Sequence, residues 1–176
     1  MRPALETRRL TRFAHFAPER CLRDRLIGQR GVEYISIDLA DPEANVRADL
    51  ESLIFPSEAF DLFCCNHVLE HVTHDRRAIA ELWRITRLGG RGFVQVPLQP
   101  GPTIEDPSVT APSRREQLFG QEDHVRAYGM DIVERFETVG FSVRALAGND
   151  FAAADQRARL GLESADIVFV LDKTAP

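Results

Sequence analysis

One amphipathic helix between two short apolar runs limits what this chain can fold into. Residues 60–65, FDLFCC, and 92–96, GFVQV, are short and largely apolar, as strands buried on both faces of a sheet are. Between them, Asp75–Leu88 is predicted to be a helix that ends at Gly89–Gly90. Its apolar residues recur at the spacing of one helical face: Ala78, Ile79, Leu82 and Ile85. A strand, a helix and a strand in this order build a parallel sheet.

The same alternation continues along the chain. Further strands are predicted over Phe13–Phe16, Glu33–Ile37, Val46–Ala48, Phe141–Ala147 and Asp166–Leu171, and further helices over Pro18–Ile27 and Gly129–Val139. In the last of these helices, Met130, Val133 and Phe136 are expected on the buried side. The length of 176 residues suits one core. We therefore expect an α/β fold in a single domain, residues 1–176, with helices on both faces of the sheet.

Residues 98–127 break this pattern. The segment contains Pro100, Pro102, Pro107 and Pro112, and it has few apolar residues, so no regular structure is expected there. It leaves the carboxyl end of a predicted strand, where open α/β sheets bind ligands. We interpret it as a substrate loop.

Charge and hydropathy restrict the partners. The formal net charge is −5, which argues against nucleic acid held on a basic surface. No apolar run approaches the roughly 20 residues of a membrane span, and residues 1–12 lack the apolar stretch of a signal peptide. Cys21, Cys64 and Cys65 include no C-x-x-C pair and are expected to be buried free thiols. We expect a cytoplasmic protein.

Asp38 is the first candidate for cofactor binding. It ends a predicted strand, about 20 residues beyond the first strand-to-helix turn, where an acidic side chain accepts hydrogen bonds from a ribose diol. On spacing alone, an aspartate of a strand-ending turn fits equally well. The same position would suit a nicotinamide cofactor, but the chain has no G-x-G-x-x-G to bind a pyrophosphate.

Two motifs in a fixed order give a more specific indication. Residues 48–72 read ADLESLIFPSEAFDLFCCNHVLEHV, and residues 81–90 read ELWRITRLGG. In this order they resemble the class I S-adenosylmethionine-dependent methyltransferases (type 11-like), with Leu88 where that family usually has proline. Residues 15–19, HFAPE, and 119–129, FGQEDHVRAYG, resemble a subgroup with Ala-Pro-Glu in place of the glycine-rich motif.

The resemblance implies both a fold and a reaction. The fold is a seven-stranded Rossmann-like sheet in the order 3-2-1-4-5-7-6, mostly parallel with an antiparallel last strand. The reaction is methyl transfer from the cofactor S-adenosylmethionine to a small-molecule acceptor. The alternative is a catalytically silent domain that acts as a partner or regulatory subunit. A homodimer is also expected.

The resemblance also assigns roles to residues at the strand ends. Asp38 would bind the ribose hydroxyls, and Asp49 with the backbone of Leu50 would meet the adenine. Asn66 would hold the methionine end through its backbone carbonyl, and His67 would form the floor beside the methyl group. Residues 39–48 are too few for a full helix.

The HFAPE turn departs from the glycine-rich pattern for a physical reason. S-adenosylmethionine has no phosphate, so backbone amides need not cradle one. Ala17 is small enough for close approach, and Pro18 presets a helical turn. We expect Glu19, or His15 at the strand end, to face the ammonium or sulfonium of the cofactor.

Two histidines are candidate catalytic residues. His124 lies beside Asp123 in the predicted substrate loop, and an aspartate neighbour can favour the tautomer that a general base needs. His71 is the second candidate. Because the histidines show no H-E-x-x-H or similar spacing, no metal site is expected.

Overall fold

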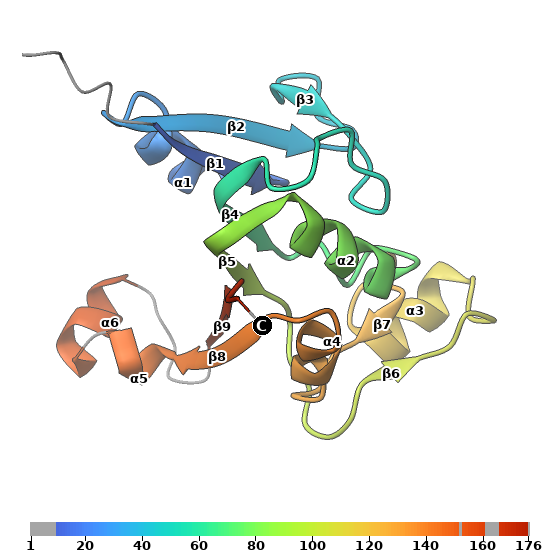
Figure 1. Ribbon diagram of the computed structural model, residues 1–176. Helices are drawn as coiled ribbons and strands as arrows, with labels where there is room; N and C mark the ends of the chain where they lie inside the picture. Colours follow the sequence, from blue (N-terminus) through green and yellow to red (C-terminus); the bar gives the residue numbers. More distant parts are fainter. Residues whose placement is uncertain (1–9, 152, 161–165, 176) are drawn as a thin grey trace, which may run out of the picture.

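The computed structural model describes residues 10–151, 153–160 and 166–175, so the two ends of the expected domain and most of residues 1–12 lie outside the described residues. Its main sheet has seven strands (Figure 1). These strands are β1 (Thr11–Phe16), β2 (Val32–Asp38), β3 (Val46–Arg47), β4 (Phe60–Asn66), β5 (Thr86–Gln95), β8 (Ser142–Ala147) and β9 (Ile167–Asp172). The helices are α1 (Arg20–Leu26), α2 (Asp75–Ile85), α3 (Pro112–Phe119), α4 (Ile132–Thr138), α5 (Gly148–Phe151) and α6 (Ala154–Leu160).

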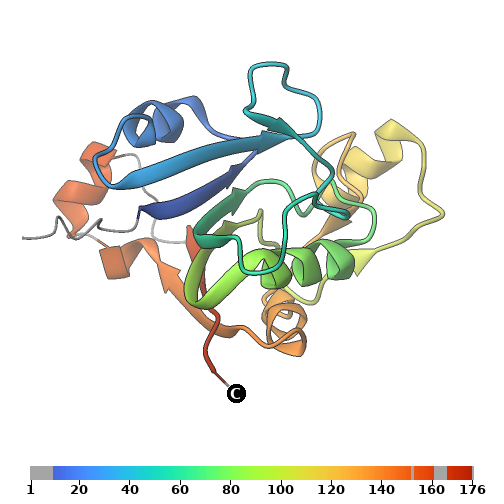
Figure 2. The same cartoon turned by 45° about the horizontal axis from the view of Figure 1, so that its top comes forward.

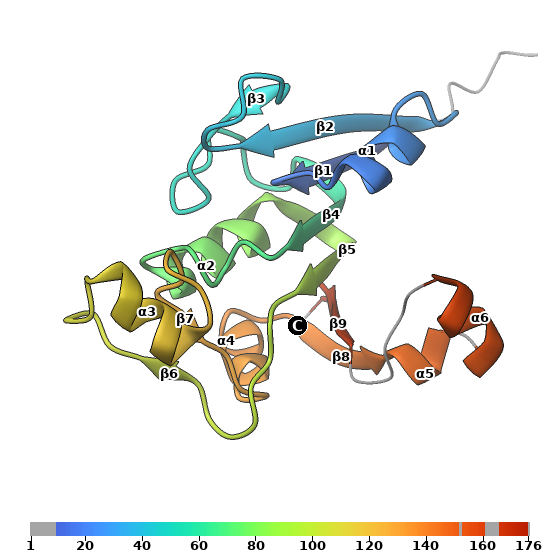
Figure 3. The ribbon, with the colours of Figure 1, turned by 180° about the vertical axis from the view of Figure 1, so that it is seen from behind.

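The strand order is β3-β2-β1-β4-β5-β9-β8, which confirms the predicted order. The pairs from β3 to β5 are parallel, whereas β9 runs antiparallel to both β5 and β8. The arrowheads of β1, β2 and β4 point to the side where α3 lies (Figure 3). β3 lies toward that same end of the sheet (Figure 2). The carboxyl ends of the parallel strands therefore meet at one edge of the sheet.

Helices lie on both faces of the sheet, as predicted. α2 and α4 cover one face and bury the main core, whereas α1 lies on the other face (Figures 1 and 3). Cys65 is in the core under α2, and its neighbour Cys64 points to the opposite face, beside Glu19. Both thiols are free and buried, but Cys21 is exposed, so the prediction that it is buried was wrong.

The glycine pair at residues 89–90 does not end a helix. α2 ends at Ile85, three residues earlier than predicted, and β5 begins at once with Thr86. A side chain at Gly90 would come within 2.9 Å of the Asp61 carbonyl of the neighbouring strand. At Gly92 it would overlap the ring of Phe63. Gly90 and Gly92 therefore allow β5 to pack closely against β4 and the core. From the sequence alone, such a glycine cannot be distinguished from one that ends a helix.

Two other helices are shorter than predicted. Because Glu19 is the extended N-cap of α1, Pro18 and Glu19 lie before the helix and not within it. α4 begins at Ile132 and buries Ile132, Arg135 and Phe136, whereas Met130 is exposed. The predicted apolar face of that helix was therefore wrong at Met130.

The prediction that residues 98–127 lack regular structure was also wrong. They contain α3 and a two-stranded ribbon of β6 (Ile104–Glu105) and β7 (Arg126–Ala127). A buried polar network ties this segment to α2. Asp75 accepts hydrogen bonds from the hydroxyl of Tyr128 (2.7 Å) and from Arg135 (2.5 Å), and Glu105 accepts from Arg126 and Arg135 at 3.1 Å.

Among the described helices, none combines the length and the apolar character that crossing a membrane requires.

Candidate functional site

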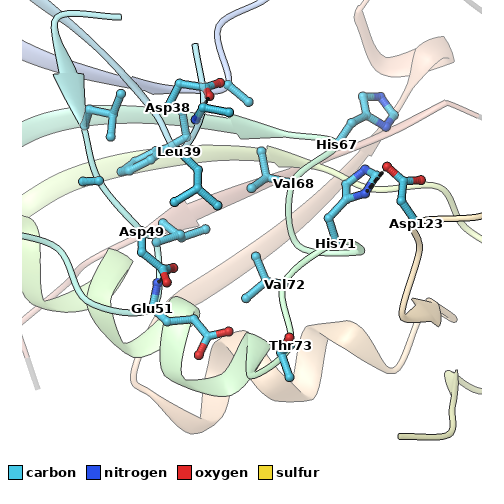
Figure 4. A pocket seen from close by; sticks show the side chains of 16 residues that line it. Asp38, Leu39, Asp49, Glu51, His67, Val68, His71, Val72, Thr73 and Asp123 are labelled. Carbon is cyan, nitrogen blue, oxygen red and sulfur yellow. Dashed lines mark hydrogen bonds and ion pairs between the residues drawn. The ribbon is translucent and has the colours of Figure 1, made fainter. Parts of the chain in front are cut away.

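A cavity of about 600 Å³ opens at the carboxyl ends of β1, β2 and β4. Six of the predicted site residues line it: Ala17, Asp38, Asp49, Leu50, His67 and His71. Figure 4 shows two walls, with the two aspartates on one side and the two histidines on the other. Each wall comes from segments that directly follow a strand, because the parallel strands end at the same edge.

Asp38 is held by the turn that follows β2. Its Oδ1 accepts hydrogen bonds from the backbone N–H groups of Ala40 (2.7 Å) and Asp41 (2.8 Å). Within the described part of the chain its second oxygen, Oδ2, accepts no hydrogen bond, and the side chain lines the cavity. Asp38 therefore ends the strand through one oxygen and presents the other to the cavity. The two interpretations of this residue, an aspartate of a strand-ending turn and a ligand for ribose hydroxyls, are compatible.

The neighbouring wall is formed by Asp49 and Leu50. Asp49 is exposed, and its Oδ1 accepts the backbone N–H of Glu51 at 2.9 Å. Leu50 is buried and contributes apolar surface. The residues between β2 and β3 form turns and no helix, as predicted from their number.

The turn after β1 has the backbone of a glycine turn without a glycine. Ala17 has φ +42°, in the left-handed region that disfavours residues with a Cβ, and its N–H donates to the Ile37 carbonyl at 2.9 Å. His67, across the cavity, has φ +51°. Two left-handed non-glycine residues thus line one cavity, and such strained positions cluster at functional sites.

His15, Glu19 and Asn66 form a hydrogen-bonded cluster behind this turn. His15 is fully buried, with Nε2 2.7 Å from Oε2 of Glu19 and Nδ1 2.9 Å from the hydroxyl of Tyr34. Asn66 donates from its side-chain amide to Oε1 of Glu19 at 2.8 Å. Because an ionised carboxylate only accepts, Nε2–H donates to Glu19, which leaves Nδ1 to accept from Tyr34 in the neutral imidazole.

These contacts perturb the pKa values in the cluster. Burial alone would raise the pKa of Glu19, but hydrogen bonds from His15 and Asn66 outweigh it and lower the pKa to about 2. Burial raises the pKa of Cys64 to about 12, and the nearby charge of Glu19 adds to that. Glu19 is therefore ionised and Cys64 is a neutral thiol. The two oxygens of Glu19 are used within the protein, although its side chain remains 35% exposed.

The structure brings His71 and His124 together, although 53 residues separate them. Their rings meet edge to face with centroids 4.7 Å apart. Nδ1 of His71 is 3.2 Å from Oδ2 of Asp123, whereas Nδ1 of the buried His124 is 2.9 Å from the Phe119 carbonyl. The prediction that Asp123 orients His124 was wrong, because the loop turns that carboxylate toward His71.

Arg126 and Tyr128, the other polar neighbours of His124, bind the protein itself. Arg126 donates to the backbone carbonyls of Leu69, Val72 and Thr73. Burial raises the pKa of Tyr128, whose hydroxyl donates to Asp75. The guanidinium of Arg126 therefore anchors the loop to the segment after β4.

Sequence reasoning did not select Glu70, which the structure places close to both catalytic candidates, His71 and His124. Its side chain is 2% exposed, and neither carboxylate oxygen accepts a hydrogen bond from the described residues. The only signal in the sequence is its place in the motif HVLEHV. A second cavity of about 240 Å³ is lined by Glu70, His124 and Phe119, among others.

The strand order and the cavity at the strand ends define a Rossmann-like methyltransferase fold. A family model described as a methyltransferase domain matches residues 25–94. Over these residues, which are fewer than half of the chain, the protein is similar to that methyltransferase family. The Ala-Pro-Glu subgroup stays a prediction.

Solved structures agree on the fold. A Burkholderia thailandensis 1,6-didemethyltoxoflavin-N1-methyltransferase, with bound 1,6-didemethyltoxoflavin and S-adenosylhomocysteine, is 16% identical, with a TM-score of 0.64 over 95% of this chain and 72% of that one. A SAM-dependent methyltransferase from Archaeoglobus fulgidus is 13% identical, with a TM-score of 0.61 over 93% and 86% of the two chains.

A third structure is a complex of the Haloferax volcanii Trm112 methyltransferase activator with a methyltransferase, at 13% identity, a TM-score of 0.60, and 96% and 84% coverage. No curated protein sequence matches the chain. At these identities the structural likeness concerns the fold alone.

Proposed function

We propose that this protein transfers a methyl group from S-adenosylmethionine to a small-molecule acceptor. The observation that carries the proposal is the cavity at the strand ends, where Asp38 and Asp49 lie on one wall and the strained Ala17 and His67 complete the outline. Its volume of about 600 Å³ lies in the range of small-molecule and cofactor sites. The residues present fit the cofactor that the family implies.

The chain's own residues would position the cofactor. The free oxygen of Asp38 would accept from the ribose hydroxyls, and Asp49 with the backbone of Leu50 would meet the adenine amino group. Glu19 and Asn66 do not line the cavity themselves but lie close in sequence to Ala17 and His67, which do. From there the backbone carbonyl of Asn66 and the ionised, partly exposed carboxylate of Glu19 would face the cationic methionine end. When bound, the cofactor supplies an activated methyl group on a sulfonium.

The acceptor side of the proposal rests on the second cavity. It lies next to the cofactor cavity, because Glu70 lines the second cavity and its neighbour His71 lines the first. With Nδ1–H of His124 donating to a carbonyl, Nε2 keeps a lone pair that can accept a proton from an acceptor hydroxyl or amine. His71, oriented by Asp123, is the alternative base. The remaining requirement is alignment of the acceptor with the methyl group in a site that excludes water.

Isothermal titration with S-adenosylhomocysteine tests the cofactor half of the proposal. We expect this titration to show one binding site per chain. Transfer of radiolabelled methyl groups to a panel of small hydroxyl and amine compounds tests the acceptor half. No heat and no thermal shift at millimolar ligand would favour the silent partner domain instead. The left-handed φ of Ala17 argues against that alternative, because the turn keeps the backbone shape that a glycine would take.

Oligomeric state and location belong to the proposal as well. We expect a homodimer in the cytoplasm, which light scattering of the purified chain and fractionation of cells test. Two buried free thiols, Cys64 and Cys65, support a reducing compartment. If the silent domain is correct, co-purification should instead recover a different methyltransferase as the partner.

A further inference from the structure

Three potential metal ligands converge where the segment after β4 meets the loop after α3. A carboxylate oxygen of Glu70 and one ring nitrogen each of His71 and His124 all lie within 4.8 Å of one another. Ligand atoms around a tetrahedral zinc ion are about 3.4 Å apart, so small side-chain movements would close this cluster on an ion. The spacing of the histidines does not reveal the cluster, because His124 comes from a distant loop.

Glu70 is the member of the cluster whose carboxylate lacks hydrogen bonds from the described residues. Its side chain is 2% exposed, and its two oxygens accept no hydrogen bond from the described residues. Its ion-pair partner among the described residues is His67, whose Nδ1 lies 3.4 Å from Oε1, outside good hydrogen-bond geometry. A buried carboxylate without hydrogen bonds is costly, and bound cations are one way in which proteins compensate it.

Each of the two histidines has an oxygen partner at Nδ1. Nδ1 of His71 faces Asp123, and Nδ1 of His124 faces the Phe119 carbonyl. Donation of Nδ1–H to an oxygen fixes the tautomer in which Nε2 carries a lone pair, and metal-binding histidines commonly make this kind of contact. Glu70 and Asp123 together contribute two negative charges, which a divalent cation would balance.

We propose that Glu70, His71 and His124 bind a divalent metal ion of the zinc type. One carboxylate and two imidazoles form a ligand set found in catalytic zinc sites, which keep a further position open. Glu70 and His124 line the second cavity and His71 lines the cofactor cavity, so the ion lies at the boundary between the two. Because the Nε2 lone pairs of His71 and His124 would then bind the ion, the ion would take the place of these histidines in activating the acceptor. An acceptor oxygen bound at the open position would release its proton to solvent more readily and would be held close to the cofactor cavity.

A second cluster of His15, Glu19 and Cys64 lacks these features. Both ring nitrogens of His15 and both oxygens of Glu19 already have hydrogen-bond partners, and burial raises the pKa of Cys64, which keeps it a thiol. The metal proposal therefore concerns the cluster around Glu70 only.

Titration of the full chain with zinc, after removal of any affinity tag and treatment with a chelator, tests the proposal without cofactor or acceptor. We expect one zinc per chain, and cobalt in its place should give the intense visible bands of a tetrahedral site. Glu70→Gln and His124→Ala should each weaken binding at least tenfold. Asp123→Asn should weaken it about 10- to 100-fold through the orientation of His71.

His74→Ala is the matched control, because His74 is an exposed histidine with its own carboxylate partner, Glu51, at 2.7 Å. It should bind zinc like the wild type. Thermal unfolding separates loss of metal binding from a folding defect. Without metal, Glu70→Gln should be at least as stable as the wild type, because the substitution removes a buried charge. Added zinc should raise the melting temperature of the wild type and of the control only. No zinc binding by the wild type, or equal binding by Glu70→Gln and His124→Ala, would overturn the proposal.

Discussion

Nε2 of His15 lies 2.7 Å from Oε2 of Glu19, four residues further along the chain. This contact continues on one side to Tyr34 in β2 and on the other to Asn66 at the end of β4. The three neighbouring strands β2, β1 and β4 are thereby joined through His15 and Glu19. In HFAPE, side-chain hydrogen bonds hold the turn in the shape that a glycine-rich loop reaches through backbone freedom.

Glu19→Gln should destabilise the protein at neutral pH. The amide can accept from only one of His15 and Asn66, so one donor loses its acceptor. Because the folded pKa of about 2 lies below the ordinary 4.5, this stabilisation is present above pH 4.5 and is lost as the pH falls toward 2. Urea unfolding from pH 7 to pH 2 measures it. The difference in the free energy of unfolding between Glu19→Gln and the wild type should become smaller as the pH falls. Glu43→Gln, at an exposed position, should have the same free energy of unfolding as the wild type.

Ala17 should tolerate glycine and reject a branched side chain. At φ +42° a Cβ costs about 1–2 kcal/mol, which glycine avoids while it loses more entropy on folding. Ala17→Gly should therefore leave the free energy of unfolding within about 1 kcal/mol of the wild type. Ala17→Val should lower both stability and affinity for S-adenosylhomocysteine. Equal affinity for the valine variant would mean that the turn lies away from the cofactor.

Asp38→Asn should weaken cofactor binding by about 1.5–3 kcal/mol, the range for hydrogen bonds to a charged group. Asparagine keeps an oxygen for the backbone N–H groups of Ala40 and Asp41, so the turn should survive. Titration with S-adenosylhomocysteine measures the loss. Asp41→Asn, which changes a carboxylate in the same turn, is the control. Unchanged affinity in a folded Asp38→Asn would remove Asp38 from the site.

Local patterns predicted the sheet well. Apolar runs located the strands, and the motif resemblance supplied their order, because both depend on residues close in sequence. The end of α2 could not be placed from Gly89–Gly90, since both glycines lie within β5: Gly90 packs against the Asp61 carbonyl of β4, and Gly89 has a left-handed φ of +79°. Such contacts are absent from any short window of sequence.

In the candidate site, too, the residues that follow strands could be predicted, whereas the contacts made by distant segments could not. Asp38, Asp49 and His67 follow strands, and the edge of a parallel sheet brings strand ends together. The pairing of Asp123 with His71 depends instead on how residues 98–127 fold back across the segment after β4. The buried charge of Glu70 is likewise a property of tertiary packing, which a single sequence does not display.

Arg126 should hold the substrate segment against the segment after β4. Its guanidinium donates to three backbone carbonyls, so Arg126→Ala should destabilise the protein by at least about 2 kcal/mol, because these buried groups lose their donors. Arg114→Ala, at an exposed position in α3 of the same segment, should stay within about 0.5 kcal/mol of the wild type.

Hydrogen exchange distinguishes the fixed part of residues 98–127, β7, from the part that is expected to move, α3. In the free protein, Arg126–Ala127 should be protected, since β7 pairs with β6 and its arginine is buried, whereas the largely exposed α3 should exchange faster. With S-adenosylhomocysteine and an acceptor bound, α3 should become protected as it closes over the second cavity, which Phe119 lines. In Arg126→Ala that gain should shrink, because closure needs a fixed anchor. Strong and equal protection of α3 with and without ligands would instead show that residues 98–127 are a rigid part of the fold.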